Sequence, residues 1–250
     1  MDVIARLRQV QERINVAANH ARRKPEDIKL IAVSKYASTA QIQELIKSGH
    51  RDFGENRVQN LQIRSEEIRN WAASALSPGA EAAGPIHWHM IGHLQRNKAA
   101  AALEVCDLIH GVDSLRLAEH LNDLGQTRAT AIPILMEVNT SGEAGKNGVP
   151  VPAAIHMVEQ FETMAHVKLI GLMTMARQSD NPDDARRSFS MLREIFEELR
   201  FRKICGPHFR DLSMGMSGDF EVAIAEGATM VRVGSAIFGA HQESAMALES

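Results

Sequence analysis

The sequence predicts an α/β protein folded as a single (β/α)₈ barrel, or TIM barrel, with an extra helix in front of it. Short apolar runs alternate with longer segments whose apolar residues recur at helical spacing, and eight such runs are present. Each run but the last is followed by a helical segment, and 250 residues is a common size for this barrel. A doubly wound open sheet is the alternative, but no Gly-x-Gly-x-x-Gly follows the first run. We therefore expect a closed barrel.

The predicted elements follow one another in a regular order. An amphipathic segment at residues 1–10 predicts the extra amino-terminal helix. The eight predicted strands are Leu30–Tyr36, Arg51–Gly54, His87–Gly92, Leu108–Val112, Ile132–Asn139, Lys168–Met175, Asp211–Met216 and Met230–Gly234. The predicted helices between them are Thr39–Ser48, Glu55–Ala73, Leu94–Val105, Ser114–Leu124, Pro152–Ala165, Pro182–Arg202 and Ser217–Glu226.

Two kinds of signal support these helices. Several open with residues that commonly cap or begin a helix: Ser38 or Thr39, the pair at 113–114, and Asn181 before Pro182. In the segment Ala185–Arg202, apolar residues recur three and four positions apart, which is typical of a helix packed on a sheet. These residues are Phe189, Leu192, Ile195, Phe196 and Leu199.

The rhythm of strands and helices is interrupted once. Residues 72–85 are rich in small side chains, and the rhythm resumes after them. We interpret this segment as a flexible surface insertion, so that residues 1–250 form one domain.

Composition excludes several classes of protein. A net charge of −3 argues against a general nucleic-acid-binding surface. The two cysteines, Cys106 and Cys205, lack the spacing of a zinc site or a disulfide framework. No apolar stretch reaches the length of a membrane span, and the amino terminus lacks the apolar core of a secretion signal. We therefore expect a cytoplasmic protein.

Lys35 is the most informative single residue. It ends an otherwise apolar strand, where a lysine is costly unless it is paired, solvated or used in chemistry. Burial favours the uncharged amine, which can condense with an aldehyde to form a Schiff base. A lysine that simply reaches solvent is the alternative.

The last two strands predict an anion site. In barrels of this kind the loops after strands seven and eight commonly bind phosphate. Gly234 permits close approach of a backbone, and Ser235 offers a hydroxyl and an amide near a helix start. Ser213 and Ser217 add hydroxyl donors from the preceding loop. A phosphate site facing Lys35 indicates a phosphorylated aldehyde, either pyridoxal phosphate or a sugar phosphate.

A group of histidines around the third strand raises the question of a metal. His87, His89 and His93 are close in sequence, but no carboxylate is placed to complete a ligand set. We expect no metal, and instead a histidine that hydrogen-bonds across the barrel mouth.

Six segments together resemble the YggS/PROSC family of pyridoxal phosphate homeostasis proteins. They occur in the family's order and extend over residues 29–239. The segments are Ile31-Ala-Val-Ser-Lys35, Phe53-Gly-Glu-Asn-Arg-Val-Gln59, His89-Met-Ile-Gly-His-Leu-Gln-Arg-Asn-Lys98, Leu169-Ile-Gly-Leu-Met-Thr-Met175, Leu212-Ser-Met-Gly-Met-Ser-Gly-Asp-Phe220 and Val231-Arg-Val-Gly-Ser-Ala-Ile-Phe-Gly239.

The resemblance implies a barrel similar to the N-terminal domain of bacterial alanine racemase, with pyridoxal 5'-phosphate in Schiff-base linkage to Lys35. It also implies that Arg232 faces the pyridine nitrogen and that the segment after it holds the phosphate. By this resemblance the cofactor-binding residues are Lys35, Arg232, Gly234 and Ser235, with Ser213 or Ser217 as a phosphate donor and Asn56 in the pocket wall.

Three functions compete. The first is binding, storage and delivery of pyridoxal phosphate inside the cell without robust turnover. The second is an amino-acid racemase that uses Lys35, and the third is an aldolase acting on a sugar phosphate. Racemisation needs a second acid or base, and the only tyrosine, Tyr36, is expected to point away from Lys35 because neighbouring strand residues alternate.

We therefore expect a carrier, not an enzyme. Its partners would be pyridoxal phosphate and acceptor apo-enzymes, and we expect a monomer that binds neither membrane nor nucleic acid.

Overall fold

The computed structural model describes residues 2–75, 84–177 and 181–239. Its strands are β1 (Lys29–Val33), β2 (Asp52–Glu55), β3 (His87–Met90), β4 (Leu108–Val112), β5 (Ile132–Asn139), β6 (Val149–Pro150), β7 (Val167–Met173), β8 (Asp211–Ser213) and β9 (Met230–Val233). Its α-helices are α1 (Val3–His20), α2 (Thr39–Lys47), α3 (Val58–Ala75), α4 (Arg96–Ala102), α5 (Leu115–Thr127), α6 (Ala154–Glu162), α7 (Pro182–Phe201), α8 (Phe220–Ala225) and α9 (Ser235–Phe238). Short 3₁₀ helices lie at Pro25–Asp27 and Val151–Ala153.

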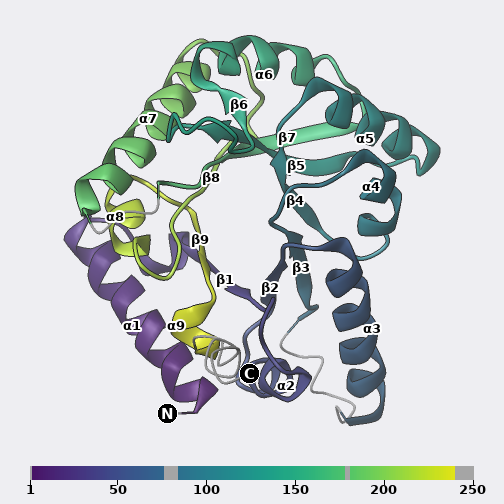
Figure 1. Cartoon of the computed structure of the whole chain (residues 1–250), viewed down its shortest axis with the longest axis vertical. Helices are drawn as coiled ribbons and strands as arrows, with labels where there is room; N and C mark the ends of the chain where they lie inside the picture. The colour runs from purple at the N-terminus through teal and green to yellow at the C-terminus, as the bar shows by residue number, and fades with distance from the viewer. Residues whose placement is uncertain (1, 76–83, 178–180, 240–250) are drawn as a thin grey trace, which may run out of the picture.

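Eight parallel strands close into a barrel, which confirms the predicted fold class. Their hydrogen-bonded order is β4-β3-β2-β1-β9-β8-β7-β5, and β4 also pairs with β5 to complete the ring. The helices surround the strands on the outside (Figure 1). The two-residue strand β6 pairs with the end of β5 and was not predicted, because two residues are too short to show a pattern.

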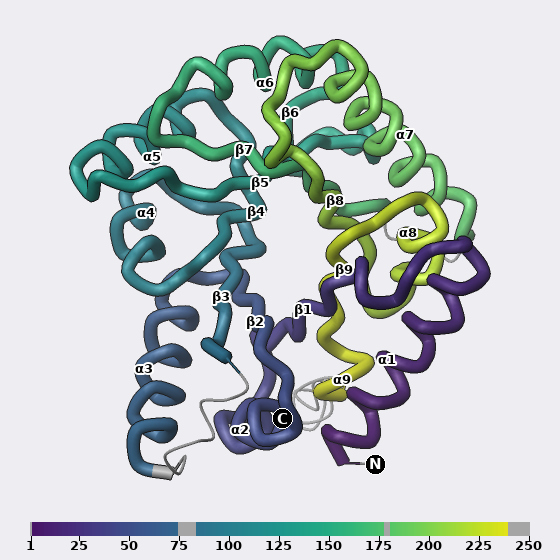
Figure 2. The backbone as a smooth tube through the Cα atoms, turned by 180° about the vertical axis from the view of Figure 1, so that it is seen from behind, coloured from purple at the N-terminus to yellow at the C-terminus, as the bar shows by residue number. Residues whose placement is uncertain are grey.

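The predicted amino-terminal helix is present and completes the ring of helices. Helix α1 packs against α8 and α9, so the first helix of the chain lies beside the last ones (Figure 2). Its side chains Leu7, Val10 and Ile14 are buried in this contact region. Asp2 caps the helix by accepting a hydrogen bond from the Ala5 amide at 2.6 Å. Among the described helices, none is long and apolar enough to cross a membrane.

Several predicted boundaries near the carboxyl end of the barrel are wrong. The predicted strands that extend to Gly92, Met175 and Met216 end two or three residues earlier, as β3, β7 and β8. Strand β1 ends at Val33, because the Ala37 amide donates to the Ser34 carbonyl at 2.9 Å and closes a turn there. Glu55 is the last residue of β2, where it pairs with Met90, and does not open a helix. Residue 217 lies in a loop before α8.

The predicted insertion lies largely outside the described residues. Residues 72–75 form the end of α3, and residues 76–83 are not described.

The barrel has two separate apolar layers. The outer shell lies between the strands and the helices and contains most of the buried apolar residues, for example Phe53, Phe161 and Phe189. The inner layer lies inside the barrel and consists of Ile31, Leu108, Leu135, Met173 and Met230. Strand side chains alternate between these layers, as the pleat of a strand requires.

Candidate functional site

Lys35 lies just beyond the carboxyl end of β1 and is exposed. Its Nζ lies 4.7 Å from the centroid of the Tyr36 ring, a cation–π contact. The prediction that Tyr36 points away from Lys35 is therefore wrong. Strand alternation does not apply, because β1 ends at Val33 and both residues belong to the following turn. The Lys35 amine is open to solvent, where a small aldehyde can reach it.

The loop after β9 brings backbone amides to the same end of the barrel. Strands β1 and β9 are neighbours, with Ala32 paired to Val233, so the turn carrying Lys35 and the segment starting at Gly234 leave the barrel side by side. A Cβ on Gly234 would lie 3.3 Å from the Val33 Cβ, so the absence of a side chain permits this close approach.

Ser217 contacts this loop directly. Its Oγ accepts hydrogen bonds from the amides of Gly234 at 3.2 Å and Ala236 at 3.4 Å. Ser235 is the first residue of α9 and is exposed, and the residue before it, Gly234, has no side chain with which to cap the helix. The Ser217 hydroxyl and two amides therefore converge at the start of α9.

Arg232 is buried at 3% exposure and points into the barrel. Its Nη1 donates to the Ser213 Oγ at 2.7 Å, and its Nη2 donates to the Thr174 carbonyl at 3.0 Å. Burial lowers the pKa of Arg232 to about 10, opposed by the nearby carboxylates of Glu137 and Asp219. The guanidinium is thus a cation held in a fixed orientation.

The two candidate serines occupy different places. Ser213 is fully buried and contacts Arg232 and His110, whereas Ser217 contacts the loop after β9. Asn56 lies in the bend after β2, where a Cβ on Gly92 would overlap with its backbone.

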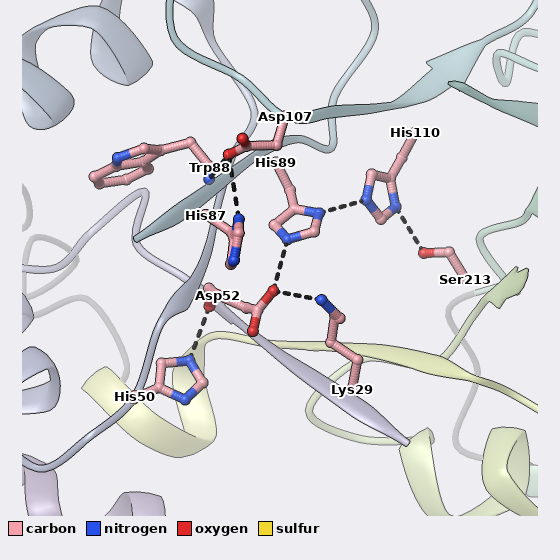
Figure 3. A network of polar contacts seen from close by, with 9 residues as sticks. All are labelled: Lys29, His50, Asp52, His87, Trp88, His89, Asp107, His110 and Ser213. Atoms are coloured by element: carbon pink, nitrogen blue, oxygen red, sulfur yellow. Dashed lines mark hydrogen bonds and ion pairs between the residues drawn. The ribbon is translucent and has the colours of Figure 1, made fainter. Parts of the chain in front are cut away.

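The expected hydrogen bond at the barrel mouth is made by His93. Its Nδ1 lies 2.9 Å from Asp113 Oδ2, just beyond the carboxyl ends of β3 and β4. His89 is buried and contacts Asp52 and His110 (Figure 3). Asp52 is the first residue of β2, so this contact lies toward the amino-terminal end of the barrel, away from the mouth. His93 therefore bears out the expectation of a hydrogen-bonded histidine at the mouth, and His89 adds a second, buried contact that was not predicted.

Glu137 was missed by the sequence analysis. It lies on β5 at 3% exposure, and burial together with the Asp113 carboxylate raises its pKa to about 7, although Arg232 and His93 act in the opposite direction. Glu137 is the one charged residue in the otherwise largely apolar segment Ile132–Asn139, just as Lys35 follows an apolar strand. The same sequence pattern that indicated Lys35 could therefore have identified Glu137.

A separate cavity of about 480 Å³ lies elsewhere at the carboxyl end of the barrel. It is lined by residues that follow β3 and β4, among them His93, Arg96, Asp113 and Arg116. Neither Lys35 nor Arg232 lines it. Lys35, Arg232 and the loop after β9 are brought together by the pairing of β1 with β9, and this cavity is not part of that site.

Comparison with known proteins agrees with the fold. A model of the alanine racemase N-terminal domain matches residues 5–242. The pyridoxal phosphate homeostasis protein of Escherichia coli (strain K12) is 35% identical over 243 residues, which is 97% of this chain and 98% of that protein. A crystal structure of a protein of unknown function from Bifidobacterium adolescentis matches with a TM-score of 0.86 at 38% identity, covering 94% of each chain. PipY of Synechococcus elongatus, solved with pyridoxal phosphate bound, matches with a TM-score of 0.75 at 32% identity over 92% of this chain and 100% of that one. The chain therefore belongs to the alanine racemase N-terminal domain family, among the pyridoxal phosphate homeostasis proteins.

Proposed function

We propose that this protein binds pyridoxal 5'-phosphate at the carboxyl end of the barrel, stores it and delivers it to apo-enzymes. The observation that carries the proposal is the pairing of β1 with β9, which brings the exposed Lys35 next to the loop starting at Gly234. The buried cation Arg232 lies on that same strand β9. An amine, a cation and an anion-binding loop then match the aldehyde, the ring nitrogen and the phosphate of one small molecule.

The residues present fit each part of this cofactor. When bound, pyridoxal phosphate supplies an aldehyde carbon that a neutral lysine amine attacks with loss of water. Because the Ser217 Oγ already accepts from two amides, its own hydrogen is available to donate to a phosphate oxygen. Ser217 is thus the better of the two candidate phosphate donors, since Ser213 is engaged inside the barrel.

Arg232 also indicates binding more than catalysis. Two of its five N–H donors are used by Ser213 and by the Thr174 carbonyl, so donors remain for a ring nitrogen. An arginine does not give up its proton, so the ring nitrogen it faces stays unprotonated and is a weak electron sink. Such a site binds the cofactor ring but withdraws fewer electrons from an amino-acid carbon than a protonated ring would.

The wider role follows from the same arrangement. An open site at the surface suits exchange of the cofactor with acceptor apo-enzymes. We further propose that residues 1–250 form one domain, which the closed barrel in the described residues supports. We also propose that the protein acts as a monomer in the cytoplasm.

Titration with two forms of the vitamin tests the phosphate assignment. We expect pyridoxal, which lacks the phosphate, to bind at least roughly tenfold more weakly than pyridoxal phosphate, because it loses charge-assisted hydrogen bonds. Ser217→Ala should reduce this preference, whereas Ser213→Ala, the matched control, should change the affinity for both forms alike. Equal affinities of the wild-type protein for the two forms would refute the assignment.

Deuterium exchange tests the absence of turnover. Racemisation requires an acid or base on each side of the substrate, whereas Lys35 and Tyr36 contact each other on one turn. We therefore expect hydrogen exchange at the α-carbon of amino acids to be far slower than about 1 per second. NMR of single amino-acid enantiomers in deuterated water follows the exchange. Exchange at enzymatic rates that both Lys35→Ala and Tyr36→Phe abolish would establish a racemase instead.

A further inference from the structure

A continuous chain of polar groups, buried from Arg232 as far as His89, links Arg232 to the opposite end of the barrel. Its last two members are less enclosed, because Asp52 is half-buried and Lys29 is exposed. Four consecutive hydrogen bonds and one ion pair form it, and none of its six residues follows another in sequence. We call it the barrel relay; its members are Arg232, Ser213, His110, His89, Asp52 and Lys29. Figure 3 shows all but Arg232, with the two imidazole rings between Ser213 and Asp52.

Every contact in the barrel relay is short enough for a hydrogen bond. Ser213 Oγ lies 2.8 Å from His110 Nδ1, and His110 Nε2 lies 3.0 Å from His89 Nδ1. His89 Nε2 lies 3.1 Å from Asp52 Oδ1, which also accepts from Lys29 Nζ at 2.8 Å. His110 is 0% exposed and His89 is 3% exposed, so water does not compete for these contacts.

The two ends of the relay determine the direction of every hydrogen bond. Arg232 can only donate, so Ser213 accepts from it and directs its own hydrogen to His110 Nδ1. That nitrogen is therefore bare, and His110 carries its proton on Nε2 and donates to His89. His89 in turn carries its proton on Nε2 and donates to Asp52, whose carboxylate can only accept.

The competing arrangement would place a positive charge on His89. If His110 donated from Nδ1 to Ser213, its Nε2 would be bare and His89 would have to donate from both nitrogens. Burial opposes such a charge and lowers the pKa of both His89 and His110. Lys29 disfavours a charge on His89 further, although Asp52 favours it there. Arg232 and Lys29 both disfavour a charge on His110.

Asp52 completes the relay as an anion. Burial favours its neutral form, but the hydrogen bonds from His89 and Lys29 prevail and hold the pKa of Asp52 well below its usual range. The acceptor at the amino-terminal end is thus charged, and it orients each neutral donor between itself and the guanidinium.

We propose that the barrel relay is a one-directional hydrogen-bond chain in which His110 and His89, both neutral with the proton on Nε2, position Arg232 for the ring nitrogen of the bound cofactor. The role toward the cofactor rests on the proposed function, whereas the direction of the chain does not. His110 and His89 are positioning residues, because they act on the cofactor through Ser213 and Arg232.

Nitrogen-15 NMR of labelled histidines in the cofactor-free protein tests the direction. We expect a bare Nδ1 and a protonated Nε2 for both rings, unchanged when the pH falls about one unit below the ordinary histidine pKa of about 6.5. His110→Gln and His89→Gln assign the two signals. A protonated Nδ1 on His110, or two protonated nitrogens on His89, would overturn the proposal.

Spectroscopy of the bound cofactor tests the positioning. His110→Phe removes both the acceptor and the donor, so we expect a shifted absorption maximum and roughly tenfold weaker binding. His110→Gln keeps an amide oxygen and an amide nitrogen on one side chain and should restore both properties largely to wild type. His156→Phe is the matched control, because His156 is an exposed residue of α6, and it should change neither.

The outcomes separate the two proposals. If His110→Phe does not fold, Ser213→Ala can replace it. This variant removes the hydroxyl between His110 and Arg232 with a smaller change in side-chain volume, and we expect the same spectral shift. An absorption maximum and affinity unchanged in both variants would refute the positioning role. If the wild-type protein does not bind pyridoxal phosphate at all, the proposed function and the positioning role fail together, but the NMR result still decides the direction of the relay.

Discussion

The outer shell and the interior of the barrel are built on different principles. The outer shell consists of apolar side chains from the outward strand faces and the helices. These side chains need no hydrogen-bond partner in a defined position. The interior combines the five apolar residues of the inner layer with the barrel relay and Glu137. Each buried polar group there needs a partner in a defined position.

This difference separates stability from function. Apolar contact is non-directional, so the outer shell can stabilise the barrel without determining what the barrel binds. The polar interior buries less apolar surface, but its hydrogen bonds orient Arg232. Arg232 lies on β9, close to the loop that follows this strand at the barrel mouth. Substitutions in the two regions should therefore change different measurable properties.

Phe189→Ala should have the largest effect on stability. Phe189 is fully buried in the outer shell, and its removal leaves a cavity, so we expect the free energy of unfolding to fall by about 3–5 kcal/mol. Phe201→Ala on the same helix is the matched control, since Phe201 is 86% exposed, and it should change this free energy by about 0.5 kcal/mol or less. Urea denaturation measures both. A large change in cofactor affinity in folded Phe189→Ala would contradict the separation of the two regions.

Glu137 should make the cofactor-free protein less stable as the pH rises. Its pKa is about 7 in the folded protein, above the ordinary value of 4.5, because burial and Asp113 disfavour the charged form. The folded state therefore binds the proton more tightly, and its contribution to stability is present below pH 4.5 and is lost as the pH rises through about 7. The contribution is on the order of 3 kcal/mol.

Thermal unfolding across this pH window, compared with Glu137→Gln, measures that contribution. The variant lacks the titrating group, so its stability should vary less with pH. Parallel pH profiles for the two proteins would show that Glu137 titrates normally.

Asp52→Asn should have the smallest of the three effects on stability, on the order of 1–3 kcal/mol, because His89 and Lys29 lose a charged acceptor. The pKa of Asp52 is lowered in the folded protein, so its contribution is present above the unfolded value of 3.8 and is lost as the pH falls below it. The difference between wild type and variant should therefore shrink in acid. Asp123→Asn, at an exposed position on α5, should show no comparable dependence.

A constant difference across the acid range would mean that the Asp52 carboxylate contributes through packing alone. The interior would then resemble the outer shell, and the comparison between the two regions would lose its basis.

The outer shell could be predicted from sequence, and the interior could not. Runs such as Ile132–Asn139 and the stripe at Phe189 and Leu192 reflect local periodicity, so the eight strands and most helices were found. The predicted ends of elements were wrong where a single hydrogen bond determines the end, as in the turn that the Ser34 carbonyl closes after β1.

The barrel relay depends on contacts between distant parts of the chain. His110 and Ser213 are 103 positions apart, and only the register of the closed barrel brings them together. No local pattern in the sequence encodes that register. The same limit explains why the sequence did not distinguish Ser213 from Ser217. The structure places Ser213 inside the barrel against Arg232 and Ser217 against the loop after β9.

Peptide mapping after borohydride reduction tests the central claim most directly. Reduction makes the bond between a lysine amine and the cofactor aldehyde permanent, and mass spectrometry of the digested protein then identifies the lysine. Lys47→Ala is the matched control for Lys35→Ala, because Lys47 also lies over an aromatic ring, at 5.7 Å from Trp71, but on helix α2. We predict a single modified peptide containing Lys35, lost in Lys35→Ala and retained in Lys47→Ala. A modified peptide centred on another lysine, or no modified peptide in the wild-type protein, would contradict the account.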